Sequence, residues 1–304
     1  MVDNIAVVVT YNRKELLLEC IEALLSQTVP VDILVVDNAS TDGTKNAIEK
    51  FIEKKGFYYL NTGSNLGGAG GFNFGIRKAY EYGYKYIWIM DDDTIPYNTA
   101  LEEFEKSKIV LKDREWGFLS SRVVWKDGNL CLMNCPVQAD EWYKNINYIE
   151  DALFPIKSTS FVSCYFKRET IERVGLPIKE FVIWKDDTEY TERISRIYES
   201  YYAVNSIVLH KINSNVATPI EKDSEDRLWR YKFLYRNIYY LAKRNGKKAV
   251  LDYYYDIAKD ICRILKSTCD KKGKRISIIC KSVLSGYRFK PEVEFVENKV
   301  QRVK

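Results

Sequence analysis

The chain has 304 residues, of which 46% are hydrophobic and 29% are charged, so it can bury one large core or one core with an appendage. No apolar run approaches the roughly 18 residues that a membrane-spanning helix needs, and no signal peptide is expected. The seven cysteines include no CxxC pair, and CLMNC at 131–135 has no histidine close to it in the sequence. These features predict a soluble cytoplasmic protein without disulfides or a zinc site.

The charge is distributed unevenly along the chain. Residues 221–304 contain 22 Lys and Arg against 11 Asp and Glu, a net charge of +11, which leaves −6 for residues 1–220. The imbalance predicts two regions with different roles, and the change in sequence pattern places their boundary near residue 215.

The first ninety residues alternate strand patterns with helix patterns. Strands are predicted at 4–11, 32–37, 56–60 and 84–90, and helices at 13–27, 40–56 and 71–83. In the first helix the apolar face is formed by Leu17, Cys20, Ile21, Leu24 and Leu25. Such alternation predicts a mostly parallel sheet with helices on both faces, in which ligands bind at the carboxyl ends of the strands.

The rest of the chain is less regular up to residue 215 and helical after it. Strands at 116–125, 158–166 and 206–210 and a helix at 170–175 suggest additions to one side of the sheet. Two long, basic, aromatic helices are predicted at 224–246 and 249–267.

Three adjacent aspartates, Asp91, Asp92 and Asp93, directly follow a buried strand pattern. A solvated acidic turn would explain them. However, three neighbouring carboxylates repel one another unless a cation neutralises them, and their hard oxygen atoms suit Mg²⁺ or Mn²⁺. The triplet is therefore a candidate metal site at the ligand-binding edge of the sheet.

A glycine-rich segment at 61–75 precedes the third predicted helix. Its exposed amides and the helix dipole would favour an anion. It matches neither GxGxxG nor a Walker loop, so a plain loop is the alternative.

A second acidic pair, Asp186 and Asp187, precedes a helix pattern formed by Tyr190, Ile194, Ile197 and Tyr201. Asp186 followed by Glu189 resembles a capping box, which would leave Asp187 free; the alternative is that both aspartates only serve the helix end. The single histidine, His210, follows the strand at 206–210. A lone histidine is usually structural, but this one is also a candidate to complete the metal site.

Taken in order, six motifs resemble one family. VVVTYNR, VVDNASTDGT, NLGGAGGFNFG, IMDDDT, FVIWKDDTEY and a Leu-His pair after a strand resemble the family 2 inverting glycosyltransferases with the GT-A fold, and most closely the galactofuranosyltransferases and related rhamnosyltransferases. The resemblance covers residues 4 to about 240. It implies an α/β GT-A catalytic domain at 1–215, with a Rossmann-like, mostly parallel sheet, followed by a basic helical region at 216–304.

The resemblance also implies site residues. Asp91 and Asp93 would bind the metal together with His210, Asp92 would lie beside the ribose or sugar, and Asp187 would be the catalytic base, with Trp184 ahead of it. Lys185 departs from the family pattern and leaves the register open by one residue, so Asp186 stays a rival base. Further contacts with the nucleotide-sugar donor are implied for Thr10, Tyr11, Arg13, Asp37, Asn65, Gly67, Gly68, Gly70 and Gly71.

The implied activity is transfer of a sugar from UDP-galactofuranose, or alternatively from dTDP-rhamnose, to a glycan or lipid-linked saccharide in bacterial surface polysaccharide synthesis. Two readings from other classes stay open. A sugar nucleotidyltransferase would also place acidic metal ligands in an α/β fold, although VTYNRKELL lacks the glycines of its pyrophosphate loop. An inactive glycan-assembly scaffold is the other.

The basic tail contains no nucleic-acid motif, so nucleic acid is not an expected partner. Its aromatic and basic residues suit peripheral contact with the inner face of the cell membrane. A helical core or a dimer interface would use the same aromatic residues, so a homo-oligomer is left open. The aromatic residues concerned are Trp229, Tyr231, Phe233, Tyr235, Tyr239, Tyr240 and Tyr253 to Tyr255.

Overall fold

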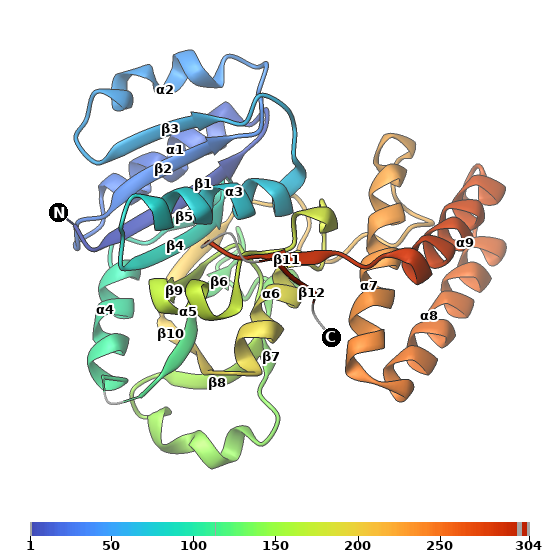
Figure 1. Ribbon diagram of the computed structural model, residues 1–304. Coiled ribbons are helices and arrows are strands. Elements are labelled where there is room, and N and C mark those ends of the chain that lie inside the picture. Colours follow the sequence, from blue (N-terminus) through green and yellow to red (C-terminus); the bar gives the residue numbers. More distant parts are fainter. Residues whose placement is uncertain (1, 113, 297–299, 303–304) are drawn as a thin grey trace.

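The computed structural model describes residues 2–112, 114–296 and 300–302 (Figure 1). Its first half is the predicted alternation of strands and helices. The strands are β1 (Asn4–Thr10), β2 (Asp32–Asp37), β3 (Phe57–Asn61) and β4 (Tyr86–Asp91), and the helices between them are α1 (Lys14–Leu25), α2 (Thr44–Ile52) and α3 (Gly67–Glu81). The four strands are parallel, in the order β3-β2-β1-β4. The prediction of a mostly parallel sheet flanked by helices is confirmed.

The second half of the sheet mixes strand directions. Its strands are β5 (Thr94–Pro96), β6 (Trp116–Val124), β7 (Val137–Gln138), β8 (Leu153–Ser158), β9 (Cys164–Lys167) and β10 (Glu199–His210). The helices between them are α4 (Ala100–Val110), α5 (Arg168–Val174) and α6 (Asp186–Ser195). β9 lies antiparallel between β4 and β6, and β10 runs parallel to β6. The short strand β5 pairs with the end of β10 so that Thr94 lies opposite His210. This pairing brings the only histidine beside the acidic turn.

Successive residues of β4 face opposite cores because side chains alternate along a strand. Trp88 and Met90 pack in a cluster with α1 and α4, whereas Ile87 and Ile89 pack in a cluster with α3, α5 and α6. The glycines of α3 allow its backbone to approach β1. A Cβ atom on Gly71 would lie 2.5 Å from Val9 Cγ1. Part of the glycine-rich sequence is therefore explained by packing.

Three helices follow the sheet and form a separate layer at its side (Figure 1). They are α7 (Tyr231–Asn245), α8 (Lys247–Lys266) and α9 (Lys272–Arg288), and the chain then returns toward the sheet as β11 (Glu292–Glu294), which pairs with β12 (Val300–Arg302). Short 3-10 turns occur at η1 (Leu132–Asn134), η2 (Trp142–Tyr148), η3 (Lys179–Phe181) and η4 (Glu225–Arg230). Within the described ranges, no helix is both long enough and apolar enough to cross a membrane.

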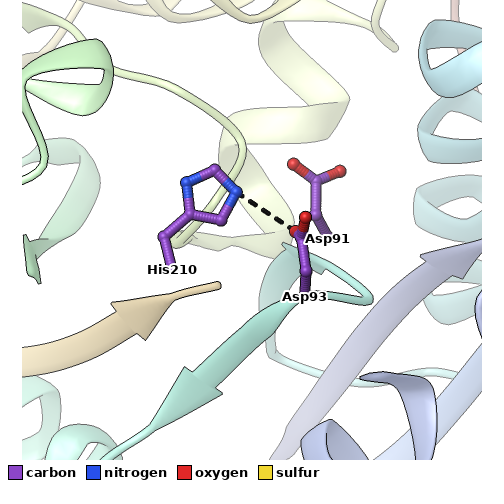
Figure 2. Close-up of side chains that lie close together, drawn as sticks. All are labelled: Asp91, Asp93 and His210. Carbon is purple, nitrogen blue, oxygen red and sulfur yellow. Dashed lines mark hydrogen bonds and ion pairs between the residues drawn. The ribbon is translucent and has the colours of Figure 1, made fainter. Parts of the chain in front are cut away.

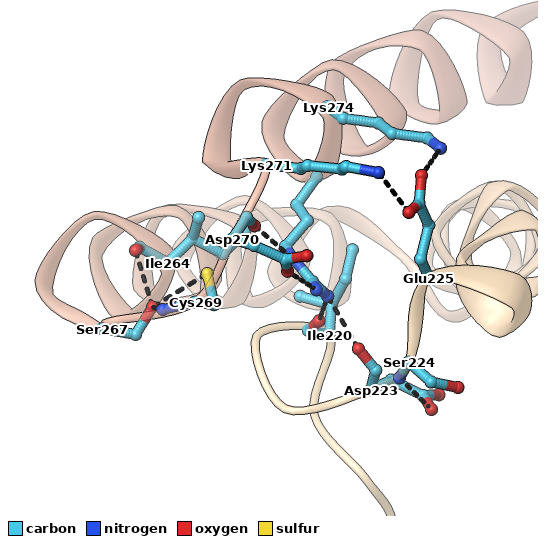
Figure 3. A network of polar contacts seen from close by, with 11 residues as sticks. Ile220, Asp223, Ser224, Glu225, Ile264, Ser267, Cys269, Asp270, Lys271 and Lys274 are labelled. Carbon is cyan, nitrogen blue, oxygen red and sulfur yellow. Dashed lines mark hydrogen bonds and ion pairs between the residues drawn. The ribbon is translucent and has the colours of Figure 1, made fainter.

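The segment that leads into α7 is fixed to α9 by a polar network (Figure 3). The buried Arg275 guanidinium donates to the carbonyl oxygens of Ile220 and Asp223 and to the Asp270 carboxylate. Lys271 and Lys274 pair with Glu225 at the start of η4. The basic C-terminal helices therefore use several of their cations to hold the connection from the sheet.

Three details of the predicted helices are wrong. Leu25 is 43% exposed because the last turn of α1 rotates it out of the core. The helix at 186 ends at Ser195, and Tyr201 lies in β10, where alternation rather than helical spacing buries it. The capping box does not form: the cap position is Lys185, Asp186 is already helical, and Glu189 points elsewhere.

The Glu189 carboxylate is instead the centre of a buried ion-pair network. It accepts hydrogen bonds from Arg193 on its own helix and from Arg244 on α7, at 3.0 and 2.5 Å. Arg193 also donates to the carbonyl oxygens of Val174 and Leu176 after α5. One carboxylate thus ties together α5, α6 and the C-terminal helices.

We expect Glu189→Gln to destabilise the protein by about 3–5 kcal/mol, because it leaves the buried Arg193 guanidinium and the largely buried Arg244 guanidinium without their counter-charge. Urea unfolding monitored by tryptophan fluorescence measures this loss. Glu192→Gln, on the same helix but partly exposed, is the control and should change stability by less than about 0.5 kcal/mol. A Glu189→Gln protein as stable as the wild type would contradict a structural role for the network.

Candidate functional site

The acidic triplet occupies the turn between β4 and β5. Asp91 is the last residue of β4, Asp92 and Asp93 form the turn, and Thr94 begins β5. This turn lies at the carboxyl edge of the parallel strands, where α/β folds bind ligands. The strand pairs on both sides hold the turn rigidly, so the three carboxylates have fixed directions.

Asp91, Asp93 and His210 converge on one point. One potential ligand atom from each lies within 4.8 Å of the others, and within the described part of the chain this is the group found that could hold a metal ion. His210 Nε2 lies 3.1 Å from Asp93 Oδ1 (Figure 2). Two carboxylates and one imidazole form a donor set that suits Mn²⁺ and accommodates Mg²⁺.

Asp92 faces the first strand instead. Its carboxylate accepts a hydrogen bond from the Thr10 hydroxyl at 2.8 Å and pairs with Arg13 Nη1 at 3.2 Å. The same guanidinium nitrogen lies 2.7 Å from Asp93 Oδ2. Thr10 and Arg13, predicted to contact the donor, are thus also the groups that hold two of the aspartates in place.

The pKa values of the triplet follow this division. Burial, followed by the charge of Asp93, raises the pKa of Asp91 to about 7. Burial also raises the pKa of Asp92 to about 6, although Arg13 opposes the shift. For Asp93, burial is outweighed by the hydrogen bond and charge of His210, so its pKa lies below the usual value. Of the three carboxylates, Asp91 therefore has the least of its negative charge balanced by protein groups. A bound cation would balance it.

Asn134 was missed by the sequence analysis. Its Oδ1 lies 2.8 Å from His210 Nδ1, which orients the ring with Nε2 toward Asp93. Cys131 Sγ donates to the same oxygen and lies 3.9 Å from His210 Nδ1. No histidine lies near Cys131 in the sequence, but the fold brings His210 close to it. No local signal marks Asn134, because it lies 76 residues from its partner.

The second acidic pair lies on the same face of the sheet as Asp91. Ile89 of β4 packs in one core cluster with Tyr190 of α6, and Asp91, two residues further along the strand, shares its direction. Cys164 on β9 is paired with Ile89, and burial followed by the negative charge of Asp187 raises the pKa of its thiol. The start of α6 therefore lies on the face of the sheet toward which Asp91 points.

Asp186 and Asp187 differ in accessibility. Asp186 is buried, and burial followed by the charge of Asp187 raises its pKa to about 7. Asp187 is partly exposed, and its Oδ1 accepts hydrogen bonds from the backbone and hydroxyl of Thr188. Burial raises the pKa of Asp187 against the opposing charge of Lys185. Trp184 lies just before this pair and packs edge-on against Tyr231 of α7.

The remaining residues predicted to contact the donor have varied surroundings. Tyr11 is exposed, whereas Asp37 is buried at the end of β2 and accepts hydrogen bonds from Ser40 N and the Tyr59 hydroxyl. In the glycine-rich segment, the Gly67 amide already donates to Asn65 Oδ1. Of the other three glycines, Gly70 and Gly71 are tightly packed, since a Cβ atom there would meet Leu66 or Val9. Gly68 faces open space.

Known proteins resemble this chain in both fold and sequence. The structure superposes with a TM-score of 0.54 on TarS (residues 1–349) of S. aureus, at 14% identity over 93% of this chain and 72% of that one. The same score relates it to the mannosyltransferase PcManGT of Pyrobaculum calidifontis in complex with GDP-Man and Mn²⁺, at 19% identity over 94% and 75% of the two chains. The fold is the GT-A fold of glycosyltransferases.

The sequence comparisons narrow the class. Residues 5–108 match the model of glycosyl transferase family 2. The chain is 27% identical over 269 residues to the galactofuranosyltransferase GlfT1 of Mycolicibacterium smegmatis. This alignment spans 81% of the present chain and 85% of GlfT1. The GlfT1 of Mycobacterium tuberculosis is 24% identical over similar shares. Both comparisons agree with the resemblance of the motifs to the family 2 glycosyltransferases, and the family model matches about the first third of the chain.

If Asn134 orients His210, its loss should weaken metal binding. We expect Asn134→Leu to lower the affinity for Mn²⁺ by about 10- to 100-fold, whereas Asn134→Asp, which keeps the acceptor oxygen, should retain it. Isothermal titration with Mn²⁺ measures both. Met133→Ala, an exposed neighbour in the same turn, is the control. Equal affinities for Asn134→Leu and the control would contradict the orienting role.

Proposed function

We propose that this protein transfers galactofuranose from UDP-galactofuranose to a glycan or lipid-linked acceptor, with inversion and with the help of Mn²⁺ or Mg²⁺. The observation that supports this most is the convergence of Asp91, Asp93 and His210, with Asp187 on the same face of the sheet. The donor is inferred from the two mycobacterial galactofuranosyltransferases, which match over four fifths of the chain. Manganese is bound by one of the structural relatives.

On the donor side, Asp91, Asp93 and His210 would hold the cation. A divalent ion bound there would stabilise the negative charge that develops on the departing diphosphate. Asp92 would lie beside the ribose or sugar, kept in place by Thr10 and Arg13. Tyr11, Asp37, Asn65 and the glycines at 67, 68, 70 and 71 would line the rest of the donor site.

On the acceptor side, Asp187 would take the proton from the incoming hydroxyl group. A single displacement needs one base on the face opposite the leaving group, and it inverts the anomeric centre. Asp187 is preferred to Asp186 because it is partly exposed, while Asp186 is buried. Partial burial raises the pKa of Asp187 and makes it a stronger base than a free aspartate. Trp184 would contribute an aromatic wall before it.

Three alternatives compete with this proposal: another donor, another reaction and no reaction at all. A dTDP-rhamnose donor would use the same cation and base, because donor identity depends on a few contacts with the base and sugar. A nucleotidyltransferase would release diphosphate from a nucleoside triphosphate, and an inactive scaffold in polysaccharide assembly would turn over nothing. The first of these is the principal alternative.

We further propose that residues 1–215 carry the reaction and that residues 216–304 bring the enzyme to an anionic membrane surface on the cytoplasmic side. Tyr231, Tyr235 and Tyr253, which were predicted to suit a membrane face, are buried inside the helical layer. The exposed apolar side chains are instead a stripe on α8 and two positions on α9: Leu251, Tyr255, Leu265, Leu284 and Tyr287. The same helices are rich in lysine and arginine, a composition typical of lipid-binding helices.

A panel of nucleotide sugars with Mn²⁺, followed by nucleotide release, tests the reaction. We expect UDP-galactofuranose to be turned over faster than dTDP-rhamnose. Asp187→Asn should lower kcat by about 10²- to 10⁴-fold with UDP binding retained, because only the proton transfer is lost. Asp186→Asn is the matched variant and should affect kcat less. The reverse order would make Asp186 the base, and turnover of nucleoside triphosphates alone would overturn the proposal.

The base should also be visible in the pH dependence. Asp187 must be ionised to act, so kcat/KM should fall as the pH falls through its raised pKa. Because the charge of Lys185 lowers the pKa of Asp187, Lys185→Ala should move this acidic limb to higher pH. Lys179→Ala, in the same loop, is the control. A limb that stays in place or moves to lower pH would argue against Asp187 as the base.

Flotation with vesicles tests the membrane contact. We expect binding to vesicles containing phosphatidylglycerol but not to pure phosphatidylcholine, and loss of binding in the double variant Leu251→Glu, Leu284→Glu. Ile109→Glu, an equally exposed apolar position on α4, should leave binding unchanged. Failure to float together with a dimeric mass in solution would assign the face to a second copy of the chain.

A further inference from the structure

The backbone just before the acidic pair has an unusual conformation. Val182, Trp184 and Lys185 all have positive φ angles, of 65°, 64° and 70°. This region of conformational space is unfavourable for residues with a side chain, and particularly for β-branched ones. Such a segment keeps its shape only if its surroundings hold it.

The main support comes from Asn237, a residue of α7 that is 0% exposed. Its Nδ2 group donates to the carbonyl oxygens of Phe181, Ile183 and Trp184, at 3.1, 3.2 and 2.8 Å. Two N–H bonds serving three carbonyls mean that at least one is shared. The Phe181 carbonyl also accepts hydrogen bonds from Ile183 N, at 2.7 Å, and from Arg236, so the carboxamide adds to existing bonds there. For Ile183 and Trp184 the carboxamide supplies hydrogen bonds of the kind that a helix or strand would provide.

Neighbouring groups fix the carboxamide and the segment from other sides. Arg236 donates to Asn237 Oδ1 through Nε and Nη2, at 3.0 and 2.9 Å, which sets the direction of the amide group. On the opposite side, the Val182 carbonyl accepts from Ala69 N at 3.2 Å. Gly67 makes room for it, since a Cβ there would lie 2.3 Å from that oxygen.

We propose that Asn237 is a positioning residue: it holds 181–185 in the conformation that directs Asp187 toward the reacting hydroxyl group, so that the C-terminal helices complete the active site. The inference rests on the proposed role of Asp187 as base. Asn237 touches neither base nor substrate and acts through the backbone that carries them. Strain in the segment makes this support necessary, because without it the backbone would relax toward negative φ and move the start of α6.

The test compares Asn237→Leu, similar in size but without hydrogen bonds, with Tyr235→Phe. Tyr235 is buried on the same helix but bonds to Asp260 within the helical layer, so this control reports loss of stability without a change at 181–185. Asn237→Asp is the second variant, to be used if the leucine variant folds poorly. It keeps the shape of the side chain but replaces the donating amide group with a carboxylate. Three quantities are measured: kcat and KM for transfer, UDP affinity with Mn²⁺, and hydrogen exchange of the amides at 182–188.

We expect Asn237→Leu and Asn237→Asp to lower kcat by about 100-fold, the typical effect of misplacing a reacting group by about 1 Å. UDP affinity should stay within about twofold, and amide protection should fall at 182–188 more than elsewhere in the protein. Tyr235→Phe should keep both kcat and this local protection. The proposal is overturned if both Asn237 variants keep the wild-type kcat, or if their losses match those of Tyr235→Phe.

The proposed function and this inference fail in distinguishable ways. If the wild type transfers sugar from no donor, the proposed function is wrong, while hydrogen exchange still reports whether Asn237 holds the segment. If exchange at 182–188 is unchanged in the variants, the support by Asn237 is wrong even when the enzyme is active.

Discussion

Mutual repulsion among three carboxylates at the end of β4 is the constraint around which the site is arranged. Each carboxylate has a different compensation: Asp92 has Thr10 and Arg13, Asp93 has Arg13 and His210, and Asp91 has little. A neutral residue in place of one aspartate would remove this repulsion. That the chain retains all three, with one left under-compensated, is the physical argument for a cation.

The compensating groups come from distant parts of the sequence, and the sheet brings them together. Parallel pairing places the end of β1, with Thr10, beside the end of β4. Pairing of β5 with β10 places His210 opposite Thr94. The same alternation along β4 that buries Ile89 directs Asp91 toward the α6 side. Strand register, rather than any local motif, therefore determines the geometry of the site.

The C-terminal helices are joined to the site by two polar contacts. Glu189 of α6 shares its charge with Arg244 of α7, and Asn237 holds the carbonyls of the segment before α6. Glu189 and Asn237 are themselves buried, and leaving a buried polar group or its partner without a hydrogen bond is costly. The helices that follow the sheet thus contact the segment that carries Asp186 and Asp187, which composition and net charge alone would not have suggested.

The sequence by itself determined the parallel α/β core and its acidic edge, because hydrophobic periodicity and turn residues are local properties. It also indicated the resemblance to family 2 glycosyltransferases, through motifs that are short and ordered along the chain. Only the tertiary structure decided the partner of Glu189, the end of α6 at Ser195, the exposure of Leu25 and the roles of Asn134 and Asn237. Those features depend on contacts between residues tens of positions apart, and no local pattern encodes which buried polar groups will meet.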